Sequence, residues 1–239
     1  MKRLSAVAFV LLMAVSASFG YWNYFPVIEG GKGEANINSN GGIKIRYGAT
    51  DQIELFATNA VGGLNGSSYG IGGRYQIIPE MFSFSLDLGI PYNSGEPGSC
   101  FGIVPAVQFS KGITDKLVLA GGAGLGLDFS LPNGKTKDGK AEDGMLMNLD
   151  IGVELDYNIT DVVLVWAGVN YIADAMNLDK AEDAVIAPAV GVQFYLGDNL
   201  ILGTSVGIDL NAQKYKDGVP DGKKETIGFS GGVDFSVKF

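Results

Sequence analysis

The sequence has no histidine and a single cysteine, Cys100, among its 239 residues. Histidine is the commonest general base of enzymes that activate a serine or a water, so we do not expect an enzyme. One cysteine cannot form an internal disulfide, and we expect a free thiol. Charged residues make up only 18% of the chain, with a formal net charge of -9. A nucleic-acid partner would need clustered Lys and Arg, so none is expected.

Long apolar runs are also lacking beyond residue 20, which argues against a helical membrane protein. Within the first twenty residues, Lys2 and Arg3 precede the apolar run AVAFVLLMAV (6–15), and small residues follow it. This pattern predicts a secretory signal peptide over 1–20, cleaved after Ser18 or Gly20, and a single domain over 21–239. The alternative is an ordinary N-terminal helix. No cysteine follows the run, so a lipoprotein anchor is not expected.

What the sequence has in excess is glycine, 36 residues, and a strict alternation of apolar with small or polar residues. From Ile227 to Phe239 every second residue is apolar except Gly231, and the residues between are Gly, Ser, Asp and Lys. A strand separates two such sets onto opposite faces, whereas a helix would mix them. The stretches 82–90, 149–157 and 200–208 repeat the pattern. We therefore expect an all-β protein.

Short and long connections alternate along the chain. The short ones centre on 50–51, 79–80, 114–115, 160–161 and 198–199, and three of them are Thr-Asp pairs that favour tight turns. The long ones cover about 59–67, 92–99, 131–144, 174–183 and 212–224. Short turns on one side and long loops on the other are typical of an antiparallel transmembrane β-barrel. The strands expected between them lie near 42–48, 52–58, 68–77, 81–91, 101–110, 116–130, 146–158, 162–173, 185–196, 200–211 and 225–239.

One more strand, within 22–37, is needed to bring the N-terminus up from the short-turn side. The total is about 12 strands, with 10–14 possible. Aromatic residues favour a membrane barrel over a soluble, ligand-binding one, because they gather towards the strand ends and leave aliphatic middles. Those expected near the short turns are Tyr47, Tyr75, Phe82, Phe109, Tyr157, Phe194 and Phe239, and those near the loops are Tyr69, Phe101, Phe129, Tyr171 and Phe229.

The chain resembles the Gram-negative outer-membrane β-barrel proteins, closest to the twelve-stranded porin-like or transporter-like barrels. The most specific motif is the C-terminal strand, in which a polar residue and a glycine precede alternating apolar residues and a terminal aromatic: Ser230, Gly232, Phe235, Val237 and Phe239. The resemblance implies a location in the outer membrane and recognition of this strand by the barrel assembly machinery. The spacing departs from the family's usual ending, since Lys238 and Phe239 lie beyond the glycine-based register.

Strand parity places a set of charged residues on the face opposite the apolar one, as lumen-lining candidates: Lys44, Arg46, Glu54, Arg74, Asp87, Asp128, Asp150, Glu154, Asp156, Asp209 and Asp234. The set is net acidic. We therefore expect a passive channel or small-solute transporter with a polar, net acidic lumen. The alternative is a non-conducting structural or surface-interaction barrel. The sequence indicates neither the solute nor the oligomeric state.

No cofactor or metal site is expected. The glycine-rich stretch 121–126 lacks the spacing of a phosphate-binding loop and has no following Lys-Ser or Lys-Thr. The acidic loops 131–144 and 174–183 lack the ligand order of a calcium loop.

The signal-peptide prediction is testable on exported protein. Protein recovered from the membrane fraction should begin at residue 19 or 21, because cleavage follows Ser18 or Gly20. Intact-mass measurement and N-terminal sequencing give the result directly. A mature chain that still begins at Met1 would favour the N-terminal helix.

Overall fold

The computed structural model describes residues 28–39, 42–62, 66–78, 81–92, 100–130, 145–175, 184–210, 213–216, 219–224 and 227–239. The predicted signal peptide lies outside these ranges. The described part contains no helix long and apolar enough to cross a bilayer.

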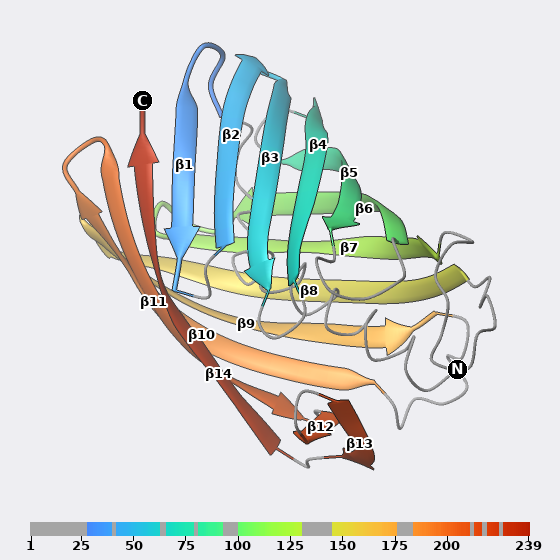
Figure 1. Ribbon diagram of the computed structural model, residues 1–239. Helices are drawn as coiled ribbons and strands as arrows, with labels where there is room; N and C mark the ends of the chain where they lie inside the picture. The colour runs from blue at the N-terminus through green and yellow to red at the C-terminus, as the bar shows by residue number, and fades with distance from the viewer. Residues whose placement is uncertain are drawn as a thin grey trace.

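Twelve strands form one closed antiparallel barrel (Figure 1), in the order β1-β14-β11-β10-β9-β8-β7-β6-β5-β4-β3-β2. Neighbours in the ring are consecutive in sequence except at the step from β11 to β14 and at the closing contact between β14 and β1. The strands are β1 (Gly33–Asn38), β2 (Gly42–Thr50), β3 (Ile53–Gly62), β4 (Gly66–Ile78), β5 (Phe82–Tyr92), β6 (Cys100–Gly112), β7 (Leu117–Ser130), β8 (Met145–Thr160), β9 (Val163–Asp174), β10 (Val185–Leu196), β11 (Leu200–Leu210) and β14 (Ile227–Lys238).

The predicted all-β fold and the count of twelve barrel strands are confirmed. The strand expected within 22–37 is β1, and it is the shortest in the barrel, with 6 residues. One feature was not predicted. The expected loop 212–224 contains a separate two-stranded sheet, β12 (Gln213–Lys216) and β13 (Val219–Lys224).

The three Thr-Asp turns form as their residues suggested, and the turn expected at 79–80 lies outside the described residues. The hydroxyl of Thr50 accepts hydrogen bonds from the amides of Gln52 and Ile53. Thr114 accepts equivalent bonds from Lys116 and Leu117, and Thr160 accepts one from Val162. A side-chain oxygen thus replaces water for amides at the rim, and each hairpin turns tightly.

The register fixes the size of the barrel. Starting from Lys116, just before β7, one can step from each residue to its partner on the next strand. This path passes through Asp234, circles the barrel once and returns to β7 at Ser130, about 14 residues from its start, which is the register offset (shear) of the barrel. Twelve strands with this offset tilt by about 40° from the barrel axis, and their backbone lies at a radius of about 11 Å.

The outward face is apolar and exposed. Along β2, Ile43, Ile45 and Tyr47 are 39%, 48% and 48% exposed, while Arg46 between them is 6% exposed. Near the short turns the predicted aromatic girdle is present, with Tyr47, Tyr75, Phe109, Tyr157, Phe194 and Phe239 among the exposed apolar side chains. Phe229 is exposed towards the loop end, whereas the side chains of Tyr69, Phe101 and Phe129 lie outside the described part. An apolar belt outside a polar interior is the pattern of a barrel that spans a lipid membrane.

Residues 28–32 cross the short-turn rim before β1 begins. The amide of Gly31 donates to the carbonyl of Gly48 at 2.8 Å, and the amide of Gly48 donates to Lys32 at 2.9 Å. The amide of Ile28 reaches the carboxylate of Glu54 at 3.1 Å. A Cβ at position 48 would overlap the carbonyl oxygens of Ile28 and Glu29. Glycine at 48 therefore permits the close approach of this segment.

The substitution Gly48→Ala should displace residues 28–32 from the rim and leave the barrel folded. We expect the amide of Gly31 to exchange with solvent at least about 10-fold faster, as its bond to Gly48 is lost. Gly73→Ala is the matched control, because the nearest atom to its added Cβ lies at 3.5 Å, an ordinary contact. Equal exchange in the two variants would contradict this account.

Candidate functional site

The inward face of the barrel is polar, and many of its side chains are buried. Buried polar or charged residues come from nine strands and alternate with exposed apolar ones: Glu34, Arg46, Glu54, Arg74, Gln76, Ser83, Ser85, Gln108, Ser110, Asp156, Gln193 and Ser236. A soluble protein would bury the apolar set instead. Here lipid replaces water outside, so the polar groups are inside, where they can pair with one another or with water.

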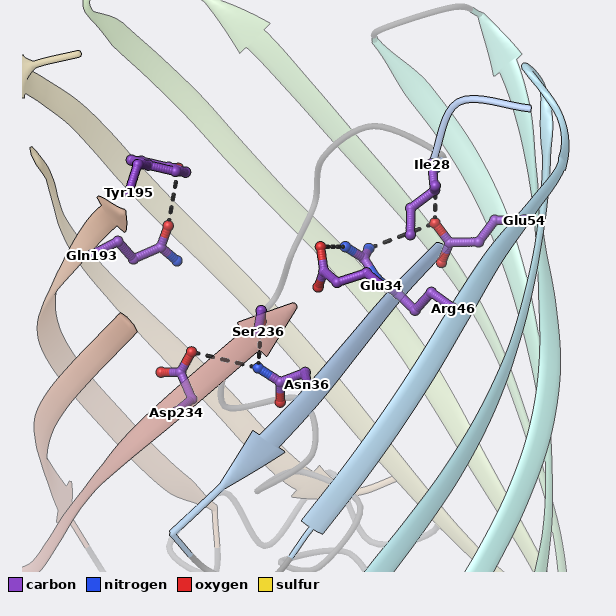
Figure 2. A network of polar contacts seen from close by, with 9 residues as sticks. All are labelled: Ile28, Glu34, Asn36, Arg46, Glu54, Gln193, Tyr195, Asp234 and Ser236. Carbon is purple, nitrogen blue, oxygen red and sulfur yellow. Dashed lines mark hydrogen bonds and ion pairs between the residues drawn. The ribbon is translucent and has the colours of Figure 1, made fainter. Parts of the chain in front are cut away.

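Four charges of alternating sign occupy neighbouring strands on one wall: Glu34 on β1, Arg46 on β2, Glu54 on β3 and Arg74 on β4. Glu34 lies directly opposite Arg46 in the register, and Glu54 opposite Arg74. The guanidinium of Arg46 is 3.0 Å from the carboxylate of Glu34 and 3.6 Å from that of Glu54. Figure 2 shows Arg46 between the two carboxylates, with Ile28 at Glu54. We call these four residues the charge ladder.

The charge ladder is isolated from water. The side chains of Arg46 and Glu34 are 7% and 6% exposed, and that of Glu54 is 0% exposed. Two residues before Arg46 on the same face of β2, the ammonium group of Lys44 lies 4.9 Å from the centre of the Phe56 ring, in the range of a cation–π contact. With Lys44 included, this wall has three cations and two carboxylates, a formal charge of +1.

The acidic members of the predicted set lie elsewhere in the ring. Asp150, Glu154 and Asp156 share the inward face of β8, and Asp209 and Asp234 share that of β11 and β14. Among the described residues, none of these five carboxylates forms an ion pair with Lys or Arg. Asp234 is 3.5 Å from the amide nitrogen of Asn36, which also contacts Ser236 (Figure 2). The five carry a formal charge of -5.

Three inward aromatic residues were missed from the sequence: Trp166, Tyr195 and Phe56, the last of which lies against Lys44. Trp166 on β9 pairs with Asp156 and is 6% exposed. Its indole covers Gly191 on β10, where a Cβ would overlap the ring. Tyr195 donates its hydroxyl proton to Gln193 at 3.1 Å (Figure 2), and the ammonium group of Lys238 is 5.9 Å from its ring. Leu164 and Ile172 share the inward face of β9, so alternation alone gave no signal for Trp166.

Nine of the eleven lumen candidates therefore occupy inward positions in the structure: Lys44, Arg46, Glu54, Arg74, Asp150, Glu154, Asp156, Asp209 and Asp234. The side chains of Asp87 and Asp128 lie outside the described part. In the C-terminal motif, Ser230 and Gly232 have the inward parity, and Phe235 is exposed outward with Phe239 at the rim. No group of acidic, Cys or His residues in the described part could hold a metal ion.

The charge ladder gives a stability prediction. Arg46→Met should lower the free energy of unfolding by about 3–5 kcal/mol, because Glu34 and Glu54 would remain buried beside each other without their shared cation. Urea titration of the protein in lipid vesicles measures this. Lys32→Met is the control, since its pair with Glu29 has side chains 62% and 66% exposed and should be worth less than about 1 kcal/mol. Equal losses in the two variants would show that the ladder does not stabilise the barrel.

The fold is shared with outer-membrane channels. The chain is similar to an outer membrane channel from Pseudomonas putida F1, with 10% identity and a TM-score of 0.57 over 91% of this chain and 98% of that one. It is also similar to the NanC porin, with 11% identity and a TM-score of 0.53 over 87% and 97%. The KdgM porin in complex with disordered oligogalacturonate gives 9% identity and a TM-score of 0.52 over 87% and 96%. No family model and no curated protein matches the sequence. The chain thus has the fold of the twelve-stranded, porin-like barrels of the Gram-negative outer membrane.

Proposed function

We propose that this barrel is a passive outer-membrane channel for ions and small polar solutes, with a preference for cations and neutral molecules. The observation that carries the proposal is the imbalance of paired and unpaired charge inside. The cations of β2 and β4 share their wall with Glu34 and Glu54, whereas the five carboxylates of β8, β11 and β14 form no ion pair with Lys or Arg among the described residues.

The sign of this imbalance decides which solutes enter easily. Charges in a narrow passage with low-dielectric walls act over longer distances than charges on an open surface, so unpaired carboxylates concentrate cations and repel anions. The KdgM porin was solved with oligogalacturonate, an acidic sugar polymer. The unpaired charges in this chain are negative, so an acidic sugar is not the solute we propose.

The inward side chains also suggest where passage is narrowest. A backbone radius of about 11 Å leaves room for a central passage only where inward side chains are short. The inward Gly124 leaves that room, whereas Gly191 and Gly203 are covered by the side chains of Trp166 and Asp234. The charge ladder, Trp166 and Tyr195 reduce it nearer the short-turn rim. We propose that the lumen candidates line this passage, and that selectivity arises at this level.

The C-terminal strand and the N-terminal segment have roles outside the passage. We propose that Ser230, Gly232, Phe235, Val237 and Phe239 are read by the barrel assembly machinery, and that residues 1–20 are removed on export. Both steps concern delivery to the membrane and are independent of conductance.

A second function is favoured by one observation. The inward polar side chains near the short-turn rim are buried, with Glu54 at 0%, Gln108 at 2% and Asp156 at 6% exposure. Such a packed layer would suit a non-conducting structural or surface-interaction barrel. Conductance separates the two functions.

Purified protein in planar bilayers should give discrete conductance steps and a reversal potential that shows preference for K⁺ over Cl⁻. Removing two formal charges with Glu154→Gln and Asp156→Asn should lower the K⁺/Cl⁻ permeability ratio by a factor of about two to five. Asp161→Asn, which removes an exposed charge on a short turn, should leave the ratio unchanged. If no conductance steps are observed in any of several salts, the channel function is rejected and the structural barrel is favoured.

A further inference from the structure

The barrel wall is incomplete at the seam between its first and last strands. β14 pairs with β11 along its whole length, from Ile227 to Val237. On its other side it pairs with β1 only from Asp234 to Lys238, and the amide of Ser39 adds one further bond to the carbonyl of Val233. Figure 1 shows β14 continuing well past the end of β1. Among the described residues, no strand pairs with Ile227–Gly232 on this side.

The short β1–β2 hairpin is the reason. β1 ends at Asn38 and β2 begins at Gly42, whose amide donates to the Asn38 side chain at 3.0 Å and closes the hairpin. Ser39 fixes its tip to β14, because its hydroxyl accepts the amide of Val233 at 3.0 Å. Only residues 40 and 41 lie between, and they reach at most about 7 Å, whereas the edge beyond Val233 runs for about 17 Å. The β12–β13 hairpin pairs only with itself.

The register shows which backbone groups face this gap. Even-numbered residues of β14 bond towards β11, as the amide of Lys238 does to Asn199. Odd-numbered residues bond towards β1, as Phe239 does to Gly33 and Val233 to Ser39. The amides and carbonyls of Ile227, Phe229 and Gly231 therefore point into the gap. We call the space bounded by Ile227–Gly232, by Asn38, Ser39 and Gly42 of the hairpin tip, and by the upper end of β3 the lateral slot.

The lateral slot lies at membrane depth. The last outward residues before the hairpin tip are Ile37 and Ile43, 52% and 39% exposed, so the tip lies within the apolar belt. Beside the slot, Val206 and Ile208 on β11 are 62% and 39% exposed, so the belt continues to that height. A membrane strand needs about 9–11 residues, and β14 has only twelve, so its unpaired half cannot lie wholly above the hydrocarbon.

Hydrocarbon cannot satisfy the amides and carbonyls that point into the slot. Irregular or unpaired backbone at this depth is tolerated only where it is buried in protein or lines a water-filled space. The slot therefore joins the lumen to the apolar belt. Its lumen side carries small residues, Gly228, Ser230 and Gly232, and its outer side carries Phe229, which is 85% exposed, with Ile227 and Val233. Two missing strands leave a width of about 14 Å between β14 and β3.

From these features we infer that the lateral slot is a portal through which a slender amphipathic solute passes between the lumen and the outer leaflet. The polar backbone and Ser230 meet the solute's polar end, and Phe229 meets its apolar part. The solute is neutral or cationic, since the unpaired lumen charges are negative; this one element rests on the proposed function. The portal itself is independent of axial conductance.

Hydrogen exchange tests whether the slot is open. In lipid nanodiscs, the amides of Phe229 and Gly231 should exchange at least about 100-fold faster than those of Ser230 and Gly232, which bond to β11. Phe235 and Val237 have the same parity but pair with β1, so their amides should be protected. If residues 229 and 231 are as protected as 230 and 232, another segment completes the wall and the portal is overturned.

A closure variant tests passage. Six residues, three for each strand and alternating Thr with Val, are inserted between Ser39 and Gly42 to extend the hairpin along Phe229 and Gly231. The control carries the same six residues within 131–144. The probe is the neutral dye N-phenyl-1-naphthylamine, added to vesicles with lipopolysaccharide in the outer leaflet and phosphatidylethanolamine in the inner one. Dye entry should be about fivefold slower in the closure variant, with exchange at residues 229 and 231 now slow.

The outcomes separate the two proposals. Unchanged dye entry in a closure variant whose amides have become protected would overturn the portal, even if the wild-type slot is open. Closure-sensitive dye entry without conductance steps would support the portal and reject the channel. The anionic dye 8-anilinonaphthalene-1-sulfonate, which is similar in size, should enter more slowly than the neutral one. Equal entry of the two dyes would overturn the sign assigned to the solute.

Discussion

The need of every backbone amide and carbonyl for a hydrogen-bond partner inside hydrocarbon controls this structure. A flat sheet of twelve strands would leave two edges without partners, and closing the ring removes both. Closure requires β1 to meet β14, so the first described strand and the last one of the chain lie side by side. The contact is short, because β1 has 6 residues and β14 has 12. The short β1–β2 hairpin leaves the edge of β14 from Ile227 to Gly232 without a strand partner among the described residues.

Closure also determines where the charges lie. Glu34, Arg46, Glu54 and Arg74 lie on the consecutive strands β1 to β4, so the charge ladder forms by hairpin pairing, and closing the ring places β8 on the opposite wall. Arg46 then has one carboxylate on each side, and the wall is close to neutral. The carboxylates of β8 lie on the far side of the ring order and have no such neighbours. The ion pairs of one wall therefore leave the carboxylates of the other wall as the main uncompensated charge, and the selectivity that we propose depends on the strand order as well as on the composition.

Much of the fold could be predicted because its determinants are local. Alternation in 227–239 separates two faces within one strand, and the Thr-Asp pairs close turns with their own side chains. Parity then placed Arg46, Glu54 and Asp156 on the inner face. Glu34 was missed because β1 is short and weakly patterned, and Trp166 because both faces of β9 are largely apolar. The β12–β13 sheet was missed because its glycine- and aspartate-rich sequence predicted only a loop.

The lateral slot could not be predicted, since it arises from a difference in length between strands that are far apart in sequence. In an antiparallel barrel with a register offset of about 14, the strands are tilted, and each hairpin tip lies at a different position along the barrel axis. A short hairpin therefore leaves a gap in the wall only at its own position in the ring. Here that position is the seam, where no other strand among the described residues pairs with the upper part of β14. A longer β1–β2 hairpin would complete the wall and leave the axial passage as the single connection between the lumen and its surroundings. The short one retained here connects the polar interior to the lipid as well, so one barrel can serve solutes of two kinds without any change in its lumen.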